Sequence, residues 1–90
     1  MLDKLAGIDA RYEKLNRLMT EGAAGDYSKI AEYGRERASL EEIVGAYREY
    51  QTVLKDLAGA RALLDDSSMA DLAADEVRTL EKRRDELEAH

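Results

Sequence analysis

Residues 40–64 read LEEIVGAYREYQTVLKDLAGARALL, and this stretch decides the fold class of the 90-residue chain. Apolar side chains recur in it every three or four residues, which is the spacing of one face of an α-helix. The sequence contains no proline, so nothing in the stretch forces the helix to stop. With its upstream extension the series predicts one helix from about 27 to 64. The expected apolar face of this helix consists of Ile30, Tyr33, Leu40, Ile43, Tyr47, Tyr50, Leu54, Leu57 and Leu64.

Three glycines lie inside this predicted helix, at Gly34, Gly45 and Gly59. Each costs about 1 kcal/mol relative to alanine in a helix interior. We therefore expect them to mark either bends or positions where another helix approaches closely.

A shorter helix is predicted before it, over about 2–20. Its apolar face is Leu5, Ile8, Tyr12, Leu15 and either Leu18 or Met19. The helix should end in the sequence EGAAG at 21–25, where Gly22 suits a left-handed C-cap and Gly25 loosens the chain again. Asp26 follows as the expected N-cap of the long helix.

The third helix is predicted over about 68–89, after the break DDSS at 65–68. Ser68 and Asp71 have the spacing of a capping box, with Asp in place of the usual Glu or Gln. The apolar face of this helix is expected to be Met69, Leu72 or Ala73, Val77, Leu80 and Leu87, with Arg84 filling one step.

Composition supports an all-α fold. Ala, Glu, Lys, Leu and Arg make up 51 of the 90 residues, as is typical of coiled coils and long helices. Leu, Ile and Val number only 18, so the core should be thin. At 1.5 Å per residue the helices would be roughly 28, 57 and 33 Å long. These lengths predict one domain over 1–90, an elongated three-helix, coiled-coil-like antiparallel hairpin with a short N-terminal helix. A structure two helices thick leaves apolar surface uncovered, which favours a homo-oligomer or a chain that continues past His90.

Catalytic, metal and cofactor sites are not expected. There is no Cys and one His, at the last position, so thiolate and imidazole chemistry and the usual zinc sites have no residues to use. The carboxylate pairs are Glu41 with Glu42, Asp65 with Asp66, and Glu86 with Glu88. General acid catalysis would require one of them in an apolar pocket, and their surroundings indicate solvated helix faces or caps.

No apolar run approaches the roughly 20 residues that span a bilayer.

Nucleic-acid binding is disfavoured by charge. The 14 basic and 20 acidic residues give a net charge of −6. Two basic groups stand out, Arg35 with Arg37 and the run Lys82–Arg84, but both lie among acids. The tyrosines Tyr12, Tyr33, Tyr47 and Tyr50 fall on predicted packing faces, so buried or half-buried rings explain them better than base stacking.

Three strings carry a family resemblance. LEEIVGAYREYQ at 40–51, LKDLAGARALLDD at 54–66 and MADLAADEVRTLEKRRDELE at 69–88 resemble the N-terminal domain of bacterial peptide chain release factor 1. LDKLAGIDARYEKLNRLM at 2–19 is similar to the first helix of that domain. The first loop, GAAGD at 22–26, is shorter than the family commonly has.

The resemblance implies a docking and positioning domain of a factor that directs translation termination at the stop codons UAA and UAG in the cytoplasm. It implies contacts with the large-subunit stalk base of the ribosome and with the recycling GTPase release factor. The GGQ tripeptide and the codon-reading Pro-x-Thr type tripeptide of the family do not occur here, so the chain should not itself be an enzyme, and the domains that carry them are expected elsewhere in a longer protein. The alternative is a free-standing coiled-coil adaptor or oligomerisation module unrelated to translation.

Overall fold

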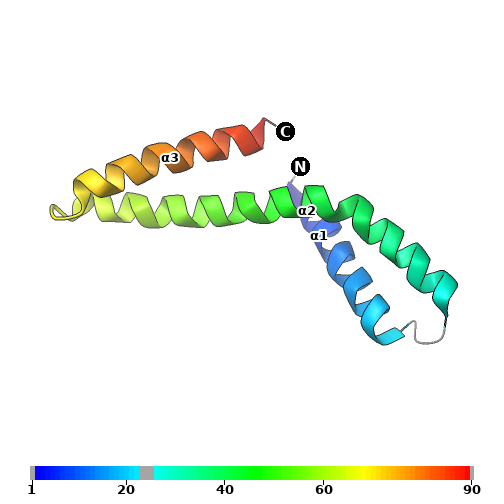
Figure 1. Cartoon of the computed structure of the whole chain (residues 1–90). Helices are drawn as coiled ribbons and strands as arrows, with labels where there is room; N and C mark the ends of the chain where they lie inside the picture. Colours follow the sequence, from blue (N-terminus) through cyan, green and yellow to red (C-terminus); the bar gives the residue numbers. More distant parts are fainter. Residues whose placement is uncertain (1, 23–25, 90) are drawn as a thin grey trace. The chain divides into compact units, whose positions relative to one another are not determined.

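The computed structural model describes residues 2–22 and 26–89, and in that part of the chain it contains helices and no strand. The predicted all-α class is confirmed. The elements are α1 (Leu2–Arg17), the π-helical turn η1 (Leu18–Gly22), α2 (Tyr27–Ala62), the 3-10 turn η2 (Leu63–Asp65) and α3 (Ala70–Glu88) (Figure 1). The chain divides into two compact units, Met1–Tyr47 and Arg48–His90, so that each holds one part of α2.

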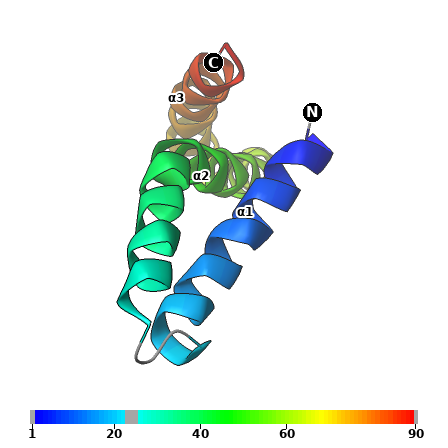
Figure 2. The same ribbon diagram turned by 90° about the vertical axis from the view of Figure 1, so that its right-hand side faces the viewer.

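In the first unit, α1 lies antiparallel to the N-terminal part of α2 (Figure 2). Leu15 is fully buried and Val44 is 3% exposed. The other members of the predicted apolar face of α1, namely Leu5, Ile8, Tyr12, Leu18 and Met19, are all half-buried. A single stripe at three- and four-residue steps therefore forms the packed face of α1, as its sequence predicted.

Asp26 caps the start of α2, as expected. Its Oδ1 accepts hydrogen bonds from the backbone N–H of Lys29, at 3.2 Å, and from the hydroxyl of Ser28, at 2.8 Å. These bonds, the Ser28 bond first, hold the pKa of the Asp26 carboxyl below its ordinary value. The cap thus satisfies an N–H that the first turn of the helix leaves without an intrahelical partner. The predicted role of Gly25 falls outside the described residues, and Gly22 is the last residue of the π-helical turn.

In the second unit, α3 returns antiparallel along the C-terminal part of α2 (Figure 1). The buried residues of α2 here are Val53, Leu57 and Ala60, which are spaced by four and three, and α3 contributes Ala73 at 3% exposed. Alanine on both helices leaves room for the two backbones to approach. The core of this unit is consequently narrow and built largely from small or β-branched side chains.

The predicted apolar face of α2 is confirmed in part, because Ile30, Tyr33, Leu40, Tyr47 and Tyr50 are half-buried and Leu57 is buried. Ile43, Leu54 and Leu64 are 41%, 38% and 41% exposed, whereas Val44 and Val53, which the prediction omitted, are buried. The apolar residues of this helix cover more than one stripe, and the prediction followed the larger side chains. A single partner helix covers only one stripe at a time, so the face that packs is set by the partner and not by residue size.

The four tyrosines on predicted faces, Tyr12, Tyr33, Tyr47 and Tyr50, are half-buried.

Helix α2 is continuous through its three glycines. Only Gly34 meets a neighbour: a Cβ added there would lie 3.6 Å from Met19 Cε, whereas one added at Gly45 or Gly59 would have nothing within 4 Å. The distance at Gly34 is an ordinary van der Waals contact with a side chain, so the expected close approach of another helix is not found at these three positions.

The capping box predicted at Ser68 and Asp71 is wrong. Helix α3 begins at Ala70, and its N-cap, Met69, makes no side-chain capping bond. Instead, Asp66 organises the preceding turn: its Oδ1 accepts bonds from the backbone N–H and the hydroxyl of Ser68, at 3.0 and 2.7 Å, and its carbonyl accepts the N–H of Met69 at 2.9 Å. The structure thus has an Asx-type turn at Asp66, two residues before Ser68, and no side-chain cap on α3.

Candidate interaction surfaces

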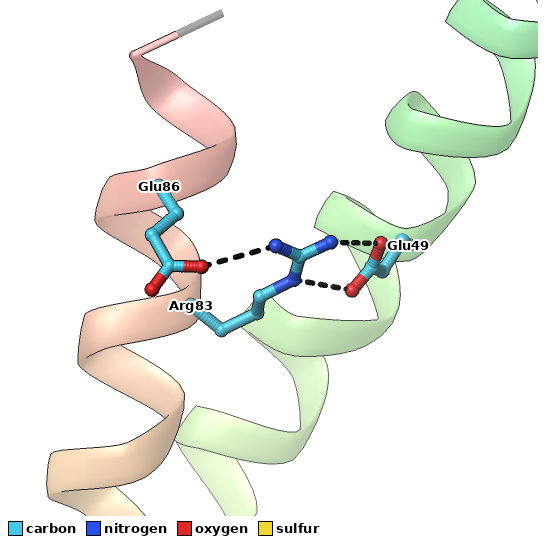
Figure 3. Close-up of polar contacts among 3 residues, drawn as sticks. All are labelled: Glu49, Arg83 and Glu86. Atoms are coloured by element: carbon cyan, nitrogen blue, oxygen red, sulfur yellow. Dashed lines mark hydrogen bonds and ion pairs between the residues drawn. The ribbon is translucent and has the colours of Figure 1, made fainter.

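The strongest polar contact of the second unit joins α2 to α3 through Arg83 (Figure 3). Its guanidinium donates two hydrogen bonds to the carboxylate of Glu49, from Nε at 2.6 Å and from Nη2 at 2.7 Å. Its Nη1 donates a third to Glu86 Oε2 at 3.1 Å. The paired bonds to Glu49 are the geometry in which arginine recognises a carboxylate most specifically. They hold the pKa of Glu49 below its ordinary value and raise that of Arg83.

A second bidentate bridge joins the two helices of the first unit. Arg11 of α1 donates from Nε and Nη2 to the Glu36 carboxylate of α2, at 2.6 and 2.8 Å. The pKa of Glu36 is lowered by this hydrogen bonding. Close by along the helices, Arg37 Nη1 donates to Asn16 Oδ1 at 3.1 Å. Each unit therefore has one two-bond arginine–glutamate bridge across its pair of helices.

Acidic pH should weaken both bridges. A glutamate in the unfolded chain has a pKa of about 4.3, whereas the pKa values of Glu36 and Glu49 in the folded chain are lowered. The bridge contribution is thus fully present above about pH 4.3 and is lost as the pH falls through the lowered folded values, because the unfolded state then binds more protons.

We expect Glu49→Gln to lower the stability against urea at pH 7 and to reduce the further loss between pH 5 and pH 3. Glu41→Gln, at an exposed position of the same helix, is the matched control. The effect should be small because the bridge is solvent-accessible. Equal acid sensitivity of the two variants and the unmodified chain would contradict this role of Glu49.

Two further contacts connect α2 with α3. The hydroxyl of Tyr50 donates to Glu88 Oε1 at 2.8 Å, which raises the pKa of Tyr50 because the bond requires its proton. Arg61 Nη2 donates to Glu81 Oε2 at 3.1 Å. Together with the Arg83 bridge these contacts join residues 49–61 of α2 to residues 81–88, the C-terminal half of α3.

The carboxylate pairs have no catalytic environment. Glu41 and Glu42 are exposed, Asp66 forms the turn described above, and Glu86 and Glu88 accept bonds from α3 and α2 side chains. Among the described residues no charged or polar side chain is buried. The pKa shifts of Asp66, Glu36 and Glu49 are all downward, which is the opposite of what a general acid needs.

The basic groups from the sequence are largely engaged with neighbours. Arg37 bonds to Asn16 and Arg83 to two glutamates, and Arg84 Nε donates to Asp85 Oδ1 at 3.0 Å. Arg35 and Lys82 are exposed. These separate contacts do not form a continuous basic surface of the kind that binds nucleic acid.

Within the described ranges, no cluster of three or more His, Asp or Glu side chains could hold a metal ion. A shallow hollow of about 250 Å³ at the end of α1 is lined by Lys14, Arg17, Leu18 and Glu21. It is smaller than the cavities that enclose small-molecule ligands. None of the described helices is both long and apolar enough to cross a bilayer.

Comparison with known proteins decides the family. The sequence profile of the PCRF domain matches residues 8–90. The chain belongs to the PCRF domain family. This match covers the three strings at 40–51, 54–66 and 69–88 that carry the sequence resemblance, and the names of the relatives given next confirm the resemblance to release factors.

Curated relatives of this PCRF domain are named peptide chain release factor 1. The protein of Bacillus cytotoxicus is 40% identical over 97% of this chain, and that of Bacillus subtilis 37% identical over 97%. The protein of Geobacillus kaustophilus is 37% identical over 97%. The chain spans only about a quarter of these relatives, 26%, 26% and 25% of their lengths. No solved structure matches it.

Sequence reasoning did not find the two bridges of this PCRF domain. Glu49 and Arg83 are 34 positions apart, and Arg11 and Glu36 are 25 apart. Glu49 lies four residues before Val53, and therefore on the same face of α2, just beyond the end of the buried stripe of the second unit. Once that stripe is known, a charged residue on its border is a candidate for an interhelical bridge.

Proposed function

We propose that this chain is the N-terminal docking and positioning domain of a peptide chain release factor 1, which directs translation termination at UAA and UAG. The observation that carries the proposal is the PCRF match over 8–90, together with relatives of that name at 37–40% identity. Because the chain matches only about a quarter of those relatives, we place codon reading and the GGQ tripeptide in the remaining part of such a factor.

The partners that follow are the large-subunit stalk base of the ribosome and the recycling GTPase release factor, in the cytoplasm. A domain with this role needs a stable helix pair and outward-facing side chains but no reaction centre. The described residues fit that requirement, because none of their charged or polar side chains is buried and the arginine partners of Glu36 and Glu49 lower the pKa values of these carboxyls. The acidic net charge of −6 argues against direct DNA binding.

Ribosomal termination complexes that hold peptidyl-tRNA at a UAA codon test the proposal. Added alone, the 90-residue chain should bind purified large subunits and release no peptide. Added in excess with full-length peptide chain release factor 1 of Bacillus subtilis, it should slow release by occupying the docking site. Peptide release by the chain alone, or failure both to bind and to compete, would overturn the assignment.

A further inference from the structure

We draw no further inference here: the strongest candidate, the shallow hollow of about 250 Å³ at the end of α1 that is lined by Lys14, Arg17, Leu18 and Glu21, presents exposed side chains of both charge signs, and nothing in the structure shows what would occupy it.

Discussion

Leu57→Ala is expected to lower the free energy of unfolding by about 2–5 kcal/mol, the range for a buried leucine whose removal leaves a cavity. Leu57 is 2% exposed and lies between Val53 and Ala60 on the face of α2 that packs against α3. The core of this unit is thin, so neighbouring side chains have few alternatives with which to fill the space. Urea unfolding followed by circular dichroism at 222 nm would measure the loss.

Leu54→Ala provides the comparison for that variant. It removes the same atoms three residues away on the same helix, from a side chain that is 38% exposed. We expect it to cost about 1 kcal/mol or less, because a partly solvated leucine loses little transfer free energy and leaves no closed cavity. Equal losses for the two variants would show that the packed face of α2 is not the one formed by Val53, Leu57 and Ala60.

This pair of variants addresses what local sequence could and could not predict. The three-to-four periodicity placed a long helix around residues 40–64, and the absence of proline indicated that it would not be interrupted. Periodicity did not determine which residues lie at the centre of the packed face, since Val44 and Val53 are buried beside the exposed Ile43 and Leu54. In α3 the periodicity allows either Leu72 or Ala73 on the packed face. In the structure Ala73 is buried, with 3% of its surface exposed, and Leu72 is 66% exposed. A small residue allows two helices to pack closely, and a prediction based on hydrophobicity alone does not take this into account.

Prediction of the candidate interaction surfaces from the sequence is limited in a similar way. Residue types support only an expectation here: one terminal His and no Cys restrict the available chemistry, so the sequence predicts no thiolate or imidazole catalysis and no zinc site of the usual ligands. The Arg83–Glu49 bridge depends instead on which residues of α2 and α3 are brought opposite each other. That alignment depends on the turn at 63–69 and on the packed stripe. The break at 65–68 was predicted, but the capping box at Ser68 was wrong, because Asp66 organises the turn instead.

Leu15→Ala should produce the largest effect in the first unit. Leu15 has no exposed surface, and its replacement by alanine is expected to cost about 2–5 kcal/mol, for the reason given for Leu57. Leu2→Ala, at a residue of the same helix that is 54% exposed, should cost about 1 kcal/mol or less. Urea unfolding of the two variants under the same conditions would provide the comparison.

Hydrogen exchange would show where the stability is lost. Because Leu15 packs within the unit Met1–Tyr47, its replacement should reduce the protection of backbone amides most strongly in α1 and in the part of α2 up to Tyr47. Amides of α3 should change less, since their protection comes from contacts around Leu57 and Ala73. An equal loss of protection throughout α1, α2 and α3 would mean that the continuous helix α2 makes the two units unfold as one.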